Sequence, residues 1–214
     1  MTTTTFINVL KEKFKQPLPG HVAQNKMSHA TRKVYKKPLE NARVACVLAL
    51  FYPKNKIEGG KEWSIVFIER QSSNPNDRHR GQISFPGGKL EEEDENLAQG
   101  ALREAEEEVG VKAKEIEIIS ALTELYIPVS NFLVYPFVGY LNYEPVFIPQ
   151  VSEVKSIIEV PISHLQNSAN RKLRDMQASP NLLIKGVPYF DVKGKVIWGA
   201  TAMILSELMD VLME

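Results

Sequence analysis

The 214-residue sequence has little of several features that mark other classes of protein. Its one cysteine, Cys46, excludes an internal disulfide and a zinc site built from several cysteines. Glycine and proline number 12 and 13, too few for a collagen-like or low-complexity chain. The longest unbroken apolar run, from Val44 to Tyr52, is far shorter than the ~20 residues of a membrane-spanning helix.

The sequence also has no excess of charge, because 26 basic side chains balance 26 acidic ones. This balance argues against a protein that binds nucleic acid through its overall charge. The N-terminus has no long apolar segment of the kind that a secretory signal requires. We therefore expect a cytoplasmic protein that binds neither nucleic acid nor a membrane, with one main domain.

Charge is nevertheless concentrated in two stretches. Residues 11–37 carry eight basic side chains and one acidic one, and residues 1–40 are interpreted as a basic N-terminal arm with a helix at 6–14. This arm is either solvated or in contact with substrate phosphates. Residues 91–108 carry nine acidic side chains, and Arg103 is their only basic neighbour. The first of these acids suit the positive end of a helix dipole, but the later ones need another explanation.

Apolar patterns in residues 41–214, which we take as the main domain, predict an α/β (α+β) fold. Strands are expected at 44–51, 64–69, 83–85, 116–122, 133–141 and 156–160, a hairpin at 182–190 and 195–198, and helices at 94–109 and 200–212. The strands outnumber the helices and do not alternate strictly with them. This order favours a mixed sheet with helices packed on its faces. The apolar terminal helix suits either the core or a homodimer interface.

The predicted helix at 94–109 separates an apolar face from an acidic one, at about 100° per residue. One narrow apolar stripe should face the core: Ala98, Leu102, Ala105 and Val109. Glu104, Glu107 and Glu108 fall together on a different face. Three carboxylates so placed repel one another unless a cation intervenes. Hard oxygen ligands suit Mg²⁺ or Mn²⁺, so this face is either a divalent-metal site or a solvated surface.

Glycines precede, interrupt and follow this helix. Gly87 and Gly88 come after a short strand, where a glycine lets the backbone approach an ion or a phosphate closely. Gly100 lies inside the predicted helix, where it costs about 1 kcal/mol relative to alanine. It either leaves room for a ligand or has no role. Gly110 stands where a helix C-cap is expected.

The acidic helix is part of a longer motif. The run from Gly88 to Val111 ends in Arg103-Glu104-Ala105-Glu106-Glu107-Glu108-Val109-Gly110-Val111 and resembles the Nudix box. The run before it is His79-Arg80-Gly81-Gln82-Ile83-Ser84-Phe85-Pro86-Gly87-Gly88. It is similar to the signature of the coenzyme A pyrophosphatase-type branch of Nudix hydrolases. The spacing from Gly88 to Arg103 is one residue longer than in the general box, as in that branch. Asp77 departs from the branch, which usually has an arginine there.

The resemblance implies a Nudix-like α/β/α sandwich with a mixed central sheet, and a pyrophosphatase that uses Mg²⁺ or Mn²⁺. The implied metal ligands are Glu104, Glu107, Glu108 and, through its carbonyl oxygen, Gly88. Glu104, Glu107 and Arg103 would serve catalysis, with Arg103 orienting the glutamates. The general base would be Glu104 or a carboxylate from a later loop, such as Glu153.

The branch also implies a small-molecule nucleotide substrate. Coenzyme A or a derivative would be cleaved at its pyrophosphate bond into 4′-phosphopantetheine and adenosine 3′,5′-bisphosphate. The implied substrate-binding residues are Arg70, Arg78, His79, Arg80 and Gln82. Trp63 and Trp198 suit either packing or stacking on adenine.

Three alternatives stay open. A Nudix pyrophosphatase of another branch would act on ADP-ribose, a dinucleotide or a nucleoside triphosphate. A non-catalytic Nudix domain would bind a nucleotide without hydrolysing it. Outside the family, an acidic helix that binds a basic partner protein would show no dependence on divalent ions.

Overall fold

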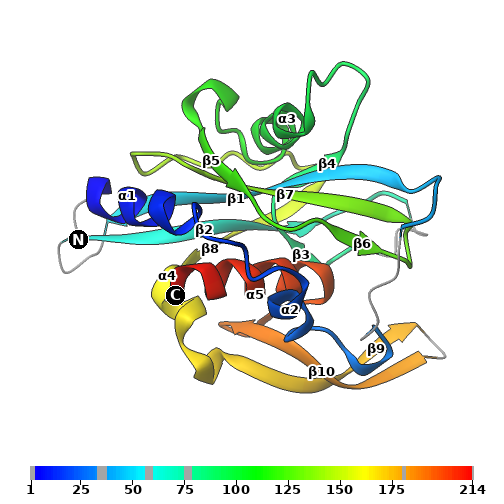
Figure 1. Ribbon diagram of the computed structural model, residues 1–214. Coiled ribbons are helices and arrows are strands. Elements are labelled where there is room, and N and C mark those ends of the chain that lie inside the picture. Colours follow the sequence, from blue (N-terminus) through cyan, green and yellow to red (C-terminus); the bar gives the residue numbers. More distant parts are fainter. Residues whose placement is uncertain (1–2, 33–37, 56–59, 75–78, 180–181, 214) are drawn as a thin grey trace.

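A mixed sheet of eight strands forms the centre of the molecule (Figure 1). The computed structural model describes residues 3–32, 38–55, 60–74, 79–179 and 182–213. The strands of this sheet are β1 (Arg43–Asn55), β2 (Lys61–Arg70), β3 (Ile83–Ser84), β4 (Gly87–Lys89), β5 (Glu117–Ala121), β6 (Leu125–Ile127), β7 (Phe132–Tyr140) and β8 (Val154–Pro161). Their order is β3-β2-β1-β7-β5, with β4 beside β1, β6 beside β7 and β8 beside β2.

The two middle strands, β1 and β2, are almost continuously apolar because both faces of the sheet are covered. β1 pairs in parallel with β7 and antiparallel with β2. Leu48 and Leu50 pack into the core on one face of the sheet. Ala49 and Phe51, which alternate with them, pack into the core on the other face.

Helices cover both faces. α3 (Leu97–Val109) packs on the face of Leu48 and Leu50, and α5 (Gly199–Met213) packs on the opposite face. Figure 1 shows α3 above the sheet and α5 below it. The remaining helices are α1 (Thr3–Lys13), α2 (Gly20–Asn25), α4 (Ile162–Gln166) and the 3-10 helices Ala30–Arg32, Ala113–Glu115 and Ser168–Asn170.

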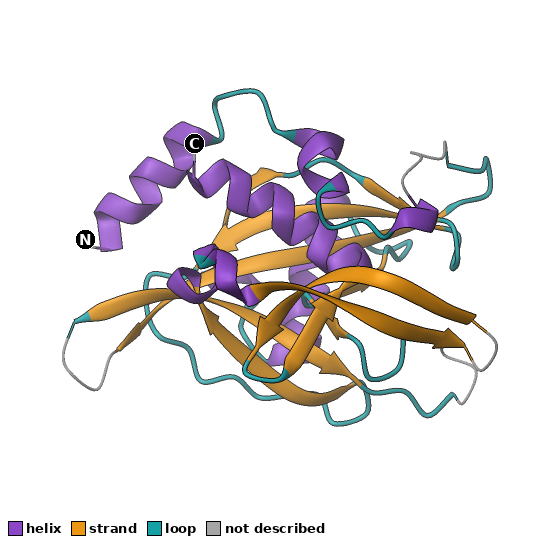
Figure 2. Cartoon of the chain, turned by 90° about the horizontal axis from the view of Figure 1, so that it is seen from below, coloured by secondary structure: helices purple, strands orange, loops and turns teal. Residues whose placement is uncertain are grey.

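A second, three-stranded antiparallel sheet consists of β9 (Arg171–Ser179), β10 (Leu182–Val192) and β11 (Lys195–Trp198). Figure 1 shows α5 between this small sheet and the large one, and Figure 2 shows from below how helices lie across strands. β11 also contacts β3, so the small sheet reaches the loop that precedes β3. No helix within the described residues is long and apolar enough to cross a membrane.

The predicted α+β fold with a mixed sheet and helices on its faces is confirmed. The pattern missed α2, α4, β4, β6 and β9. β9 carries charged residues without an apolar alternation, and it becomes a strand by pairing with β10. The apolar residues of the terminal helix lie in the core: Met203, Ile204, Leu205, Leu208 and Met209 are buried. These side chains therefore offer no surface for a homodimer.

A buried carboxylate ties the N-terminal arm to α5. Glu207 is fully buried, and it accepts hydrogen bonds from Nε2 of Gln24 at 2.8 Å and from Oγ1 of Thr123 at 2.6 Å. Gln24 Nε2 also donates to the carbonyl oxygen of Thr123 at 2.8 Å. A buried carboxylate is stable only when such donors surround it. The division into an arm at 1–40 and a domain at 41–214 stays a prediction.

Replacing Gln24 by methionine keeps the approximate size of the side chain but removes one donor to Glu207. We expect the free energy of unfolding to fall by about 1–3 kcal/mol, because a buried acceptor loses a partner. Urea denaturation of both proteins measures this loss. Gln16→Met, at an exposed position, is the matched control and should cost less than about 0.5 kcal/mol. Equal losses in the two variants would contradict a structural role for this network.

Candidate active site

The ends of α3 position its carboxylates. The side chain of Asn96 accepts hydrogen bonds from the backbone N–H groups of Ala98 and Gln99, both at 3.0 Å. This cap starts the helix at Leu97, so the predicted start at 94 was wrong by three residues. Gly110 adopts the left-handed conformation, with φ 75°, and ends the helix as expected.

The apolar stripe of α3 faces the core. Leu102, Ala105 and Val109 are buried, as predicted. Ala98 is only half-buried, and Ala101 is fully buried in its place. The stripe packs the helix on the sheet. The glutamates of the acidic face consequently lie at the edge of the contact between the helix and the sheet.

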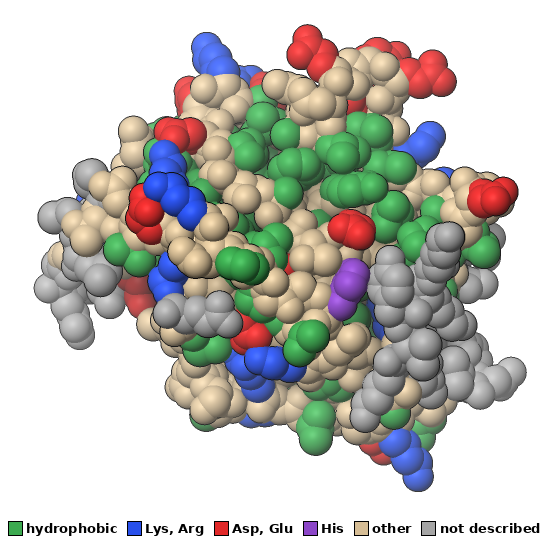
Figure 3. Space-filling model, in the orientation of Figure 1, with side chains coloured by type: hydrophobic (Ala, Val, Ile, Leu, Met, Phe, Trp, Pro, Cys, Tyr) green, Lys and Arg blue, Asp and Glu red, His purple; other side chains and the backbone are tan. Residues whose placement is uncertain are grey.

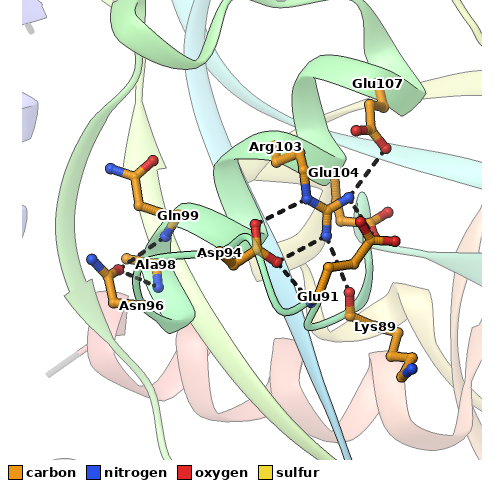
Figure 4. Close-up of polar contacts among 9 residues, drawn as sticks. All are labelled: Lys89, Glu91, Asp94, Asn96, Ala98, Gln99, Arg103, Glu104 and Glu107. Atoms are coloured by element: carbon orange, nitrogen blue, oxygen red, sulfur yellow. Dashed lines mark hydrogen bonds and ion pairs between the residues drawn. The ribbon is translucent and has the colours of Figure 1, made fainter.

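Arg103 links the surface of α3 to the turn that precedes it (Figure 4). Its Nε and Nη2 atoms donate to the two carboxylate oxygens of Asp94, at 2.9 and 3.0 Å. Nη2 also donates to the carbonyl oxygen of Lys89 at 3.1 Å. Nη1 donates to Glu104 at 3.1 Å and to Glu107 at 3.2 Å. Such charge-assisted hydrogen bonds hold the guanidinium and its four partners in one arrangement.

Sequence reasoning missed the part played by Asp94. It was expected in the first turn of the helix, but it lies before the helix with 4% of its side chain exposed. Its bond to Arg103 lowers the pKa of the Asp94 carboxyl. Gly100 was the available signal, because a Cβ at Gly100 would lie 3.0 Å from Oδ2 of Asp94. Gly100 therefore admits the loop that carries Asp94, and the interpretation that it leaves room for a ligand stays a prediction.

The remaining acids before α3 are solvated. Glu91, Glu92, Glu93 and Glu95 are exposed, and Figure 3 shows acidic side chains over the turn that leads into the helix. Water and salt screen charges at such positions. This part of the acidic stretch therefore needs no cation.

Glu108 is the most buried of the three glutamates, with 2% of its side chain exposed. Its Oε2 accepts a hydrogen bond from the backbone N–H of Gly87 at 2.8 Å, and its Oε1 lies 3.6 Å from Nη1 of Arg70. Burial is the main cause that raises the pKa of Glu108 to about 8. The negative charges of Glu104 and Glu153 add to the effect.

Glu104 is a second, largely buried carboxylate beside it, with 12% of its side chain exposed. Burial raises the pKa of Glu104, and the charges of Glu107 and Glu153 act in the same direction, while Arg103 opposes them. The ionised forms of Glu104 and Glu108 are therefore short of positive charge. A bound divalent cation would supply it.

Two glycines let β4 pass close to these carboxylates. A Cβ on Gly88 would lie 2.5 Å from the carboxyl carbon of Glu104, which is far too close. Gly87 has φ 148°, and a Cβ there would lie 2.3 Å from the carbonyl oxygen of Cys46. Gly87 needs glycine for both its conformation and the close approach of backbone, whereas a side chain at Gly88 would displace the carboxylate of Glu104.

The chemistry of the donors fits a hard divalent ion at Glu104 and Glu108, which are buried, oxygen-bearing and under-neutralised. Glu107 differs, because 56% of its side chain is exposed and it pairs with Arg103. Within the described part of the chain, no group of three or more His, Cys, Asp or Glu side chains is arranged to hold a metal ion. The assignment of Glu104, Glu107, Glu108 and Gly88 as ligands stays a prediction.

Four of the five expected substrate-binding residues lie around the end of β2. Arg70 faces Glu108, and its backbone bonds to the next loop: its N–H donates to the carbonyl oxygen of Gln82 at 2.9 Å. Nδ1 of His79 lies 3.1 Å from Oε1 of Gln82 within that loop. Arg80 is exposed. Arg78 lies outside the described residues.

Residues 41–177 match the NUDIX domain family, a segment that contains β1 to β8 and α3. The chain belongs to this family. Among curated proteins, Nudix hydrolase 15, mitochondrial, of Arabidopsis thaliana is 30% identical over 178 residues. The match covers 80% of this chain and 59% of that protein, so the chain spans less than two thirds of this relative.

Two further comparisons agree with this assignment. The uncharacterized Nudix hydrolase NudL of Pectobacterium atrosepticum is 29% identical, over 61% of this chain and 67% of that protein. The crystal structure of the Nudix hydrolase RenU from M. Smegmatis gives a TM-score of 0.52 at 14% identity. It covers 80% of this chain and 86% of that one, and this likeness shows the fold alone.

The Nudix chain also has a pocket of about 420 Å³ on the other side of β2 from Glu108. Its lining includes Glu69, Arg80, Gln82, Arg174, Lys195 and Trp198. Glu69 accepts hydrogen bonds from Lys155 at 2.5 Å and from Lys195 at 2.6 Å. These bonds lower the pKa of Glu69 to about 2. Sequence reasoning missed Glu69, Arg174 and Lys195, because they come from three distant segments.

The Glu69 cluster makes the stability of this Nudix chain depend on pH. The pKa of Glu69 is lower in the folded chain than its ordinary 4.5, so its stabilising contribution is present above pH 4.5 and is lost as the pH falls toward 2. We expect Glu69→Gln to lower the free energy of unfolding by about 1–2 kcal/mol at pH 7, since both lysines are partly exposed.

Denaturation at pH 7, 4.5 and 2.5 measures this difference, which should shrink steadily as the pH falls. Glu12→Gln, which breaks an exposed ion pair with Lys15, is the control and should change the free energy by less than about 0.5 kcal/mol throughout. A difference for Glu69→Gln that does not vary with pH would contradict the role given to its ionised form.

Proposed function

We propose that this Nudix chain hydrolyses the pyrophosphate bond of coenzyme A or its derivatives in the presence of Mg²⁺ or Mn²⁺. The products would be 4′-phosphopantetheine and adenosine 3′,5′-bisphosphate. The observation that carries the proposal is the buried pair Glu104 and Glu108 beside Gly88, whose ionised forms need a cation. The run from His79 to Gly88 supports the choice of coenzyme A.

The proposed ligands of the ion are Glu104, Glu107, Glu108 and, through its carbonyl oxygen, Gly88. Bound there, a divalent ion supplies positive charge for the diphosphate and lowers the pKa of a water molecule. Arg103 acts as a positioning residue, because it holds Glu104 and Glu107 through hydrogen bonds of 3.1 and 3.2 Å. Asp94 in turn fixes the guanidinium of Arg103 at two atoms.

A carboxylate of the pair, or one near it, accepts a proton from the attacking water. Burial raises the pKa of Glu104, which makes it a stronger base than an ordinary carboxylate. Glu153 is the alternative, because it is exposed and its charge acts on both Glu104 and Glu108. The Glu153→Gln variant distinguishes these two candidates. If Glu104 is the general base, the variant keeps the pH–rate profile of the wild type. If Glu153 is the general base, the variant loses the acidic limb of that profile.

Cationic and polar side chains at the end of β2 would bind the phosphates of the substrate. Arg70 is the nearest to the carboxylate pair, at 3.6 Å from Glu108. His79, Arg80 and Gln82 belong to the loop whose backbone bonds to Arg70. Arg78 is proposed from the sequence motif alone.

Removing one carboxylate should abolish most activity without unfolding the protein. We expect Glu104→Gln, Glu107→Gln and Glu108→Gln each to reduce kcat by roughly 10²–10⁴-fold, as for the loss of a catalytic carboxylate or metal ligand. Glu106→Gln is the matched control on the same helix, because Glu106 bonds to Lys112 and to the N–H of Ala113, both at 2.8 Å. Its kcat should stay within a factor of two or so of the wild type.

The same set of variants tests the ion without measuring turnover. A divalent ion that binds only the folded chain raises its melting temperature, by the mass action of the bound ion. Mg²⁺ or Mn²⁺ should therefore raise the Tm of the wild type and of Glu106→Gln, and a chelator should reverse the rise. The Glu104→Gln and Glu108→Gln variants should show a much smaller shift. Equal shifts in all four proteins would rule out the proposed ligands.

A substrate panel decides between coenzyme A and other nucleotides. The ratio kcat/KM should be higher for coenzyme A and acyl-coenzyme A than for ADP-ribose, a dinucleoside polyphosphate or a nucleoside triphosphate, by about tenfold or more. Comparable values for coenzyme A and ADP-ribose would overturn the coenzyme A assignment and leave a pyrophosphatase of another branch. Nucleotide binding with no hydrolysis in the panel would indicate a non-catalytic domain.

A further inference from the structure

The pocket on the far side of β2 is lined by cations from three separate segments. Arg80 comes from the loop before β3, Arg174 from β9 and Lys195 from β11. Their one acidic neighbour in the lining is Glu69, whose carboxylate bonds to Lys195 and also to Lys155. The negative charge of Glu69 is thus already neutralised by lysines.

The two arginines of the pocket keep their charge available. Within the described residues, neither Arg80 nor Arg174 forms an ion pair with a carboxylate, and the guanidinium of Arg174 lies 5.9 Å from the ring centroid of Tyr189. Both side chains belong to exposed residues at the rim. An excess of unpaired guanidinium groups around a concave surface attracts a phosphate, which they can bind bidentately.

The inner wall of the same pocket is apolar. Ile83 and Met176 are each 6% exposed, and Val196 and the half-buried Trp198 complete this wall. A flat indole beside aliphatic side chains suits a planar ring such as a nucleobase. The pocket therefore combines a site for an anion with a site for an aromatic ring.

The pocket is joined to the carboxylate site through one strand and one loop. Glu69 and Arg70 are neighbours at the end of β2 and point to opposite faces, Glu69 into the pocket and Arg70 toward Glu108. Gly81 and Gln82 line the pocket, while their backbone atoms bond to the carbonyl and N–H groups of Arg70 at 2.8 and 2.9 Å. A ligand in the pocket would therefore lie across the end of β2 from the proposed catalytic carboxylates.

We propose that this pocket binds the phosphorylated nucleoside end of the substrate. A phosphate monoester would lie between Arg80 and Arg174, and the base would lie against Trp198. This inference rests on the proposed function for the identity of the substrate, and it assigns a second phosphate, remote from the bond that is cleaved, to the small three-stranded sheet.

Direct binding tests the pocket without any turnover. The chain has two tryptophans, and Trp63 is buried in the core, so a ligand in the pocket should change the fluorescence of Trp198. Titration with adenosine 3′,5′-bisphosphate should give a saturable change that Trp198→Phe abolishes. Arg174→Gln and Arg80→Gln, followed by calorimetry, should each raise Kd by about tenfold or more, as for a lost charge-assisted hydrogen bond.

Lys185→Gln is the matched control, because Lys185 is an exposed cation of β10 outside the lining of the pocket. Its Kd should equal that of the wild type, and adenosine alone and inorganic phosphate alone should bind more weakly than the bisphosphate. A fluorescence change that survives in Trp198→Phe, or an unchanged Kd in both arginine variants, would overturn the inference.

Kinetics then connect the pocket to the reaction. Arg174→Gln should raise KM for coenzyme A about tenfold, leave kcat unchanged, and leave KM for dephospho-coenzyme A unchanged, because this compound lacks the remote phosphate. Equal effects on both substrates would overturn the placement of that phosphate. Absence of any coenzyme A hydrolysis would refute the proposed function, whereas the titration would still decide whether the pocket binds a phosphorylated nucleoside.

Discussion

The burial of two like charges, Glu104 and Glu108, is the constraint on which the site depends. Both carboxylates lie where water reaches them poorly, which raises the pKa of each, and the negative charge of Glu104 raises the pKa of Glu108 further. A fold accepts such a pair only if another group offsets the charge, and the nearest guanidinium to Glu108, that of Arg70, is 3.6 Å away. The pair is thus the electrostatically least satisfied part of the described site, which is a property common in catalytic centres.

Several local features of the chain hold these carboxylates in place. Gly88 brings β4 so close to Glu104 that a side chain there would displace the carboxylate. Arg103 joins the helix to the preceding turn by way of Asp94, and Gly100 makes space for that turn. The helix, the turn and the strand are therefore held together by direct contacts, which favours the precise geometry that a metal or substrate site requires.

The end of β2 places charged side chains on both faces of the sheet. Its alternating side chains place Arg70 toward α3 and Glu69 toward the small sheet. The loop at 79–82 then bonds to the backbone of Arg70 and lines the pocket at the same time. A substrate with two separated phosphate groups matches this arrangement, because its two ends would meet cations on opposite sides of one strand end.

Local patterns were enough to predict the middle strands, the acidic helix and its apolar face, because periodicity and helix caps act over a few residues. The Nudix resemblance likewise followed from residues close together in the chain. The partner of Arg103, the burial that raises the pKa of Glu108, and the approach of Arg70 to Glu108 could not be predicted in this way. The same is true of the pocket, which combines Glu69, Arg80, Arg174 and Lys195. Each of these depends on which strands pair and which face a helix covers, and such long-range contacts arise from the packing of the whole chain.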